Sequence, residues 1–161
     1  MINVYNVWIP ILLVLLFGRE LSQGAMKVPN AKEMFIDQVI QAMILVESDG
    51  RAHLRGRSGE RGCMQIMRSE WNFTCKRLLN VRWHFDEAFN RQKNISVGSA
   101  YMRYLFDKYD DWELAVRAYN AGHRGAIQLN RGWKYLSAIK KTLHFGNTSW
   151  RKKRSPFRRQ V

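Results

Sequence analysis

The stretch Ile44-Leu45-Val46-Glu47-Ser48-Asp49-Gly50 ends an apolar run with a carboxylate and then with residues that favour a turn. Charged side chains are mostly exposed, so an acid at the end of a buried face needs an explanation. In one interpretation, Glu47 lies at a helix end and points into water. In the other, it lines a cleft whose apolar neighbours raise its pKa, so that it can donate a proton near neutral pH.

The residues before Glu47 predict an amphipathic helix over Ala31 to Glu47. Its apolar residues recur at intervals of three and four: Phe35, Val39, Ala42, Met43 and Val46. Asn30 is a candidate cap, with Glu33 in the capping-box position. An acid in the last turn is disfavoured by the helix dipole, and this counts against the interpretation of Glu47 as a surface residue chosen for stability.

The rest of the chain has helical periods and no segment that alternates at the period of a strand, so we expect an all-α domain. Residues 50–63 are polar and rich in glycine and arginine, which predicts a loop. Gly98 inside a helix costs about 1 kcal/mol against alanine and indicates close helix packing. Further helical segments are predicted through Trp71, at 85–89, from a cap at Asn94 to 109–111, at 112–121 with a stop at Gly122, and at 133–143 after a loop.

The composition suits one domain with a real core: 161 residues, of which 46% are hydrophobic. The formal net charge of +14 predicts an anionic partner, which is nucleic acid, a membrane surface or an acidic polymer such as a cell wall. Six basic residues and no acid lie in 151–161, and we expect 147–161 to be a disordered, solvated arm.

The first residues predict export. Val7 to Gly18 is an apolar run, too short for a stable span of about 20 residues. Ser22 and Gly24 follow with the spacing of a signal-peptidase site. We therefore interpret 1–24 as a signal peptide and 25–146 as the domain; the alternative is an uncleaved N-terminal anchor.

Two cysteines, Cys63 and Cys75, leave two alternatives open: one disulfide in an exported protein, or two small buried thiols. The four histidines do not cluster and no CxxC is present. We therefore expect neither a metal site nor a cofactor.

Several motifs together resemble one family. Glu47-Ser48, then Gly59-x-x-Gly62-x-Met64-Gln65, then Ala118-Tyr119-Asn120-Ala121-Gly122 have the order and spacing of the soluble lytic transglycosylases. Asn94-Ile95 with Gly98 and Tyr101, and Tyr135 in Trp-Lys-Tyr-Leu, match two further motifs. The resemblance covers about 36–143. It implies a lysozyme-like helical domain with a substrate cleft.

That resemblance implies cleavage of the MurNAc-GlcNAc β-1,4 bond of peptidoglycan. Glu47 would protonate the leaving oxygen and then take the proton of the C6 hydroxyl, which closes a 1,6-anhydro ring without a second carboxylate. Ser48, Met64, Gln65, Tyr119, Asn120 and Tyr135 would bind substrate or support Glu47. Ser48 is otherwise a helix cap, and Tyr119 and Met64 are otherwise core residues.

The resemblance also implies a location and partners. We expect an exported, periplasmic or cell-envelope monomer that acts on glycan strands, without nucleic acid or a stable membrane span. The small size resembles enzymes that open the wall for a secretion or conjugation apparatus, or for a phage.

Other functions stay open. The loop before Cys63 is arginine-rich, and Asp49 and Glu60 lie near Glu47 in the sequence, so a hydrolytic, lysozyme-type muramidase is a second enzyme hypothesis. The charge and the tail alone would suit a nucleic-acid or membrane-surface binder, whose affinity falls steeply with salt. A catalytically dead wall-binding module is a further alternative.

Overall fold

The helix that carries Glu47 in its last turn is α2, Ala31–Ser48, and it buries the apolar stripe that its sequence predicts. Ile36, Val39, Ile40 and Met43 are at most 3% exposed, because their spacing places them on one face. The computed structural model describes residues 30–146, with side chains to 143, and every described helix belongs to one compact unit that starts at Ala31. The predicted signal peptide (1–24) and basic tail (147–161) lie outside the described residues.

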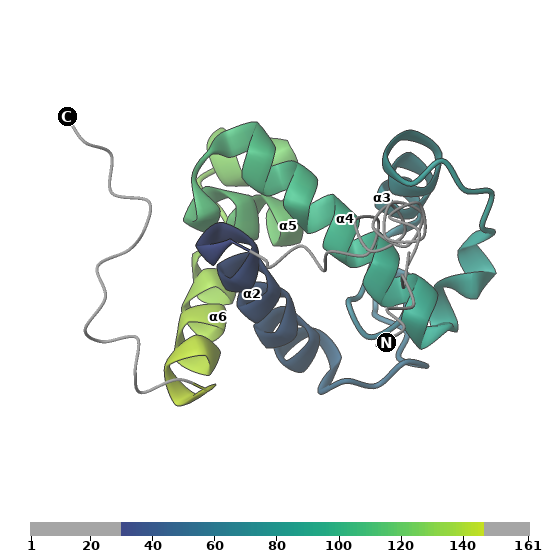
Figure 1. Cartoon of the computed structure of the whole chain (residues 1–161), viewed down its shortest axis with the longest axis horizontal. Coiled ribbons are helices and arrows are strands. Elements are labelled where there is room, and N and C mark those ends of the chain that lie inside the picture. The colour runs from purple at the N-terminus through teal and green to yellow at the C-terminus, as the bar shows by residue number, and fades with distance from the viewer. Residues whose placement is uncertain (1–29, 147–161) are drawn as a thin grey trace, which may run out of the picture. The chain divides into compact units, whose positions relative to one another are not determined.

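The described residues form helices and contain no strand, as the periodicity predicted. After α2 come α3 (Arg68–Phe73), the π-helical turn η1 (Thr74–Leu78), the 3-10 turn η2 (Phe85–Phe89), α4 (Arg91–Tyr109), α5 (Trp112–Ile127) and α6 (Trp133–Gly146). The two most extensive helix contacts are those of α4 with α5 and of α2 with α6 (Figure 1). None of the described helices is long and apolar enough to cross a membrane.

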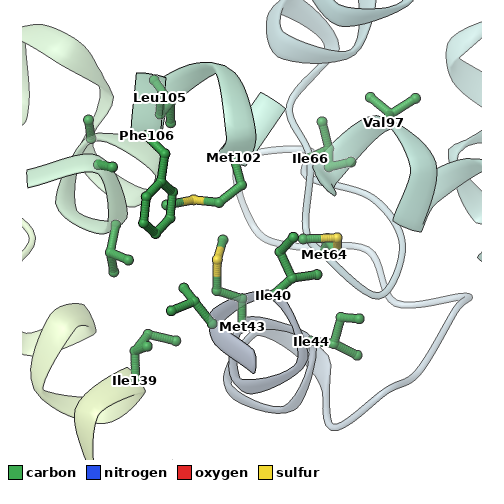
Figure 2. Packing of buried hydrophobic residues seen from close by; sticks show 14 of the residues in the cluster. Ile40, Met43, Ile44, Met64, Ile66, Val97, Met102, Leu105, Phe106 and Ile139 are labelled. Carbon is green, nitrogen blue, oxygen red and sulfur yellow. The ribbon is translucent and has the colours of Figure 1, made fainter. Parts of the chain in front are cut away.

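The core lies between α2, α4, α5 and α6 and extends under the loop that follows α2. Figure 2 shows Met43 and Met64 among the aliphatic side chains of this core. The loop packs closely on Gly98 of α4, because a Cβ added there would lie 2.4 Å from the Sδ atom of Met64. The close packing predicted from Gly98 is therefore present, but its partner is the loop and not a second helix.

The segment 49–67 is a loop with two isolated antiparallel bridges, Arg55 with Arg61 and Arg61 with Ile66. Arg61 belongs to the predicted arginine-rich loop, yet it is only 8% exposed. Its guanidinium lies 4.3 Å from the ring centre of Phe85 and pairs with Asp86 at 2.5 Å. This contact holds the pKa of the Asp86 carboxyl below its usual range. The loop is therefore anchored to η2.

Asn94 does not cap α4, contrary to the sequence prediction. The helix starts at Arg91, four residues earlier than predicted, and the side chain of Asn90 accepts a hydrogen bond from the Lys93 N–H as its cap. Asn94 is fully buried, where its Oδ1 accepts from the Met64 N–H (2.8 Å) and its Nδ2 donates to the Arg61 carbonyl (3.0 Å). A buried amide that satisfies two backbone groups fixes the loop against the helix.

Gly122 bends α5 and does not end it, so the predicted loop over 123–132 is partly wrong. The glycine has φ 71° and ψ 165°, and the helix resumes and continues to Ile127. Arg117 explains part of this second half, because its side chain is buried and donates to the carbonyls of Ala126 (2.7 Å) and Arg131 (2.8 Å). Those bonds hold the α5–α6 connection in place.

Candidate active site

A cleft of about 380 Å³ opens at the C-terminal end of α2. It is lined by residues from α2, the 49–67 loop, α3, α4 and α5. Four of the residues predicted from the sequence line it together: Glu47, Gln65, Tyr119 and Asn120. They are separated by up to 73 residues in the chain, so the fold brings them together.

Glu47 is only partly exposed in the last turn of α2. Its pKa rises from the ordinary 4.5 to about 7, chiefly because burial disfavours the carboxylate. An interaction with the Tyr135 hydroxyl opposes this rise, and the negative charge of Glu60 adds to it. Both the protonated and the ionised form of Glu47 are therefore populated near neutral pH, so it can both donate and accept a proton.

Tyr135 reaches Glu47 from α6. Its hydroxyl is buried and interacts with the Glu47 carboxyl, but the two groups stand short of a well-formed hydrogen bond. Burial and the nearby carboxyl both raise the pKa of Tyr135, so its hydroxyl stays protonated beside Glu47. The helix pair α2 and α6 thus sets the surroundings of the acid.

Gln65 presents an acceptor to the cleft. Its Nε2 donates to the backbone carbonyls of Gly62 (2.8 Å) and Leu54 (3.2 Å), which uses both hydrogens of the amide. Its backbone has a φ of 46°, held by the tight turn in which its N–H donates to the Gly62 carbonyl. The free Oε1 suits a ligand N–H or O–H.

Tyr119 and Asn120 come from α5, just before the bend at Gly122. The Tyr119 hydroxyl donates to the Met64 carbonyl at 2.9 Å and so ties α5 to the loop. Burial raises its pKa well above the usual value, so this donor stays protonated. Asn120 is exposed on the cleft wall, where its amide can reach a ligand.

Ser48 and Met64 lie elsewhere than the sequence interpretation placed them. Ser48 is 2% exposed, and its hydroxyl donates to the Cys63 carbonyl at 2.8 Å, so it fastens the loop to the end of α2. Met64 is fully buried against Gly98, beneath the cleft. Ile66 and Met67 line the cleft in its place. Cys63 and Cys75 are both buried free thiols, which is the second of the two alternatives left open by the sequence.

The polar cleft thus contains one acid, Glu47, whose pKa lies near neutral pH. A comparison of the sequence with known protein families identifies the family of the chain. The model of the transglycosylase SLT domain family matches residues 25–141, which is most of the chain. The chain belongs to this family. The resemblance inferred from the motifs is thereby confirmed.

A solved structure shares the fold of this SLT domain. It is the 70 kDa soluble lytic transglycosylase from Escherichia coli, with a TM-score of 0.53 and 22% sequence identity. The match covers 85% of this chain and 22% of that chain, so the domain spans a small part of the larger protein. At this identity the likeness shows the fold alone, and it confirms the lysozyme-like helical domain. No curated protein sequence matches the chain.

The SLT cleft also contains carboxylates that were not assigned a place in it from the sequence. Glu60 and Glu70 both line it. The sequence marks Glu60, between the motif glycines, as an acid near Glu47, whereas no sequence signal marks Glu70. The Glu60 carboxylate accepts from the Ser58 N–H at 3.0 Å, which fixes its orientation. Over the residues that the structure describes, no group of His, Cys, Asp and Glu is placed to hold a metal ion.

Proposed function

We propose that this chain is an exported peptidoglycan lytic transglycosylase that cleaves the MurNAc-GlcNAc β-1,4 bond. The observation that carries the proposal is Glu47, an acid with a pKa of about 7 in the cleft of an SLT domain. The domain is 25–146, with a signal peptide at 1–24 and a basic tail at 147–161. The net charge of +14 suits an anionic wall.

Glu47 performs two proton transfers in this proposal. It first protonates the glycosidic oxygen, and the C1–O bond breaks with its electron pair on that oxygen. The carboxylate then takes the proton of the C6 hydroxyl while O6 bonds to C1, so the 1,6-anhydro ring closes and Glu47 is protonated again. No water is consumed. The Gln65 acceptor and the Asn120 amide hold the saccharide across the cleft.

Product analysis tests this proposal directly. Purified peptidoglycan digested by the chain is separated and weighed by mass spectrometry before and after borohydride reduction. A product with an anhydro end is lighter by one water molecule, about 18 Da, than a product with a hydrolysed end. An anhydro end is also not reduced by borohydride. Products that consist of reducing ends alone would exclude the transglycosylase reaction.

Glu60 favours a second candidate function, a hydrolytic muramidase. Hydrolases need a second carboxylate to activate water or to bond the sugar, and Glu60 lines the same cleft as Glu47. The Glu60→Gln variant separates the two candidates. If Glu60 serves a hydrolytic step, the variant loses reducing-end products; if Glu47 works alone, the product distribution is that of the unsubstituted chain.

The pH dependence of lysis should follow the proton on Glu47. Because the first step needs the protonated acid, we expect kcat/KM to fall above pH 7, about tenfold per pH unit. Glu60→Gln removes a charge that raises the pKa of Glu47, so the alkaline limb moves to lower pH. Tyr135→Phe removes an interaction that lowers it, so the limb moves to higher pH.

Each of these two variants is a control for the other. Both make a small change near the Glu47 carboxyl, and they are expected to shift its pKa in opposite directions. The measurement is the rate of wall clearance as a function of pH from pH 5 to pH 9, which covers about two pH units on each side of the Glu47 pKa. Limbs that move together, or do not move, would show that a group other than Glu47 governs the profile.

The most specific part of the proposal is that the chain opens the wall locally for a secretion or conjugation apparatus. It rests on the resemblance of this chain to specialised wall-opening enzymes, and on no contact in the structure. Co-isolation of the tagged chain with components of such an apparatus from crosslinked envelopes tests it. Recovery of the chain with peptidoglycan and no such component would count against it.

A further inference from the structure

A hollow of about 500 Å³ is formed by the end of α3, the turn η1 and the irregular segment that leads to η2. It shares no lining residue with the cleft at Glu47. Glu70 of α3 lines the cleft and Asn72 lines the hollow, and side chains two residues apart point to nearly opposite sides of a helix. We call this second site the cationic hollow and define it by its lining: Asn72, Cys75, Lys76, Arg77, Asn80, Val81, Arg82 and Trp83.

Among the described residues, three cations and no acid line the cationic hollow. The cations are the exposed side chains of Lys76, Arg77 and Arg82. Over the part of the chain whose side chains the structure describes, none of the three has a carboxylate within ion-pair distance. Both acids of η2, which follow next in the sequence, are paired with other cations. Three like charges around one hollow repel one another, and an anion bound among them would relieve that repulsion.

The helix dipole accounts for only part of this charge. Lys76 and Arg77 lie in the last turn of η1, where the negative end of the dipole favours a cation. Arg82 follows in the irregular segment, beyond the last turn within which the dipole acts. Its position on the rim of the hollow is therefore explained neither by the helix nor by an ion pair.

The backbone of the cationic hollow is held by the core. The Val81 N–H donates to the Cys75 carbonyl at 2.8 Å, which closes the segment onto the end of η1. The indole of the fully buried Trp71 donates to the Trp83 carbonyl at 3.1 Å. The hollow is therefore a fixed feature of the fold, with cations on its rim.

The chemistry of the cationic hollow suits a phosphate group. A guanidinium binds phosphate oxygens through two parallel N–H donors, and an ammonium adds a point charge. A phosphate monoester carries about 1.5 to 2 negative charges near pH 7, so it balances three cations better than one carboxylate does. The amides of Asn72 and Asn80 can donate to the remaining oxygens. The apolar surface of Val81 and Trp83 leaves room for a short organic group beside the phosphate.

The Trp83 ring argues against a strand of nucleic acid in this hollow. Its centre lies 6.5 Å from that of the Trp71 ring, with the planes 41° apart, and 5.2 Å from the Lys93 ammonium. Single strands bind through bases that stack on free aromatic faces as well as through their phosphates. Because the ring is already covered by these neighbours, the hollow favours a single phosphate group.

We propose that the cationic hollow binds a phosphate-bearing organic molecule. The phosphate lies among Lys76, Arg77 and Arg82, and the organic part lies against Trp83. A soluble organophosphate and the headgroup of an anionic phospholipid present this same group to the same side chains. The site is separate from Glu47 and goes beyond the proposed function, so lysis of peptidoglycan does not depend on it.

Glycerol 3-phosphate is the soluble probe. In the full chain, NMR follows the indole N–H signal of Trp83 during a titration at constant ionic strength. We expect this signal to shift to saturation, and glycerate, a carboxylate of similar size, to bind about tenfold more weakly because of its smaller charge. The triple variant Lys76→Gln, Arg77→Gln, Arg82→Gln should raise the Kd of glycerol 3-phosphate about tenfold.

The matched control removes the same charges elsewhere. The triple variant Arg124→Gln, Arg131→Gln, Lys134→Gln also replaces two arginines and one lysine, all exposed and outside the lining of the hollow. It should leave the Kd within about twofold of the unsubstituted chain, since only the net charge changes. Both triple variants should keep the circular dichroism spectrum and the lysis rate of the unsubstituted chain. Arg82→Gln alone repeats the test with a single exposed side chain.

Vesicles distinguish the two sources of the phosphate. Sedimentation compares the two triple variants on vesicles of phosphatidylglycerol and of phosphatidylcholine. Weaker retention on phosphatidylglycerol in the hollow variant alone assigns the site to a lipid headgroup. Equal retention of the two variants, together with binding of glycerol 3-phosphate that depends on the hollow, assigns it to a soluble organophosphate.

Four outcomes overturn the proposal. Neither probe depends on the cationic hollow; glycerate binds as tightly as glycerol 3-phosphate; the control variant loses as much affinity as the hollow variant; or a single-stranded oligonucleotide of deoxythymidine binds more tightly than glycerol 3-phosphate and loses its affinity in the hollow variant alone. Absence of lysis by the unsubstituted chain would contradict the proposed function and leave this proposal standing.

Discussion

Replacing Glu47 by Gln should reduce peptidoglycan lysis by about a thousandfold or more while the chain stays folded. The amide has the shape of the acid but cannot donate the proton that the leaving oxygen needs, and general acid–base catalysis is typically worth 10²- to 10⁴-fold. Burial already favours the neutral form of this side chain, so a neutral amide suits its partly buried position. Wall clearance and circular dichroism measure the two halves of this expectation.

Glu113→Gln is the matched control, since it makes the same chemical change on the surface of α5. Its carboxylate pairs with Lys140 at 2.7 Å, and both side chains are more than a third exposed, so the change should cost little. Lysis that survives Glu47→Gln would remove this residue from the role of acid.

A nucleic-acid or membrane-surface binder would give different results. Its affinity would fall with salt and would not depend on Glu47, and the unsubstituted chain would release no sugar product.

Gly62→Ala should be the most destabilising single substitution in the loop that follows α2. The residue has φ +79°, and a Cβ there would lie 2.3 Å from the Ala88 carbonyl oxygen and 2.3 Å from the Asn94 amide. Backbone on η2 cannot move aside as a flexible side chain can. We expect the free energy of unfolding in urea to fall by about 4 kcal/mol, from the sum of left-handed strain and overpacking.

Gly59→Ala separates the two causes. Gly59 has φ +95°, but a Cβ there would meet nothing within 4 Å. It should therefore cost only the conformational strain, about 1 kcal/mol. Equal losses for the two alanines would show that the overlap with Ala88 and Asn94 is relieved. Because Gln65 follows Gly62 by three residues, Gly62→Ala should also weaken oligosaccharide binding more than Gly59→Ala does.

Long periodic segments were predictable, and local breaks were not. The helix up to Glu47 follows from apolar spacing alone, because the burial of one face dominates over four turns. Asn94 was misassigned because asparagine suits both a cap and a buried bridge, and only the packing of the loop on α4 distinguishes these roles. The sequence predicts a stop at Gly122 because glycine is common just after a helix end, while here the buried side chain of Arg117 supports a further turn.

The site, too, was predictable where motifs carried it and not where it depends on tertiary contacts. Motif order was sufficient to place Glu47, Gln65 and Asn120 around one cleft, although they lie on different elements. The inward position of Met64 depends on the absence of a side chain at Gly98, which is a tertiary contact without a local signal. The presence of Glu60 in the cleft depends on the turn in which the Ser58 N–H holds its carboxylate. Neither follows from residue type and spacing.

The loop after α2 has two parts that differ in how many substitutions they can accept, because the Asn94 amide is bonded to only one of them. Residues 61–66 are bonded to the helix through the Arg61 carbonyl and the Met64 N–H, and Arg61 is anchored on η2 as well. Residues 51–59 are largely exposed, and Arg57 among them lines the cleft. The exposed side chains of the outer segment can therefore be exchanged for ones of different charge while its backbone at Leu54, whose carbonyl accepts from Gly62 and Gln65, keeps its place. The charge of this part of the cleft wall can then change while the geometry around Glu47 is kept.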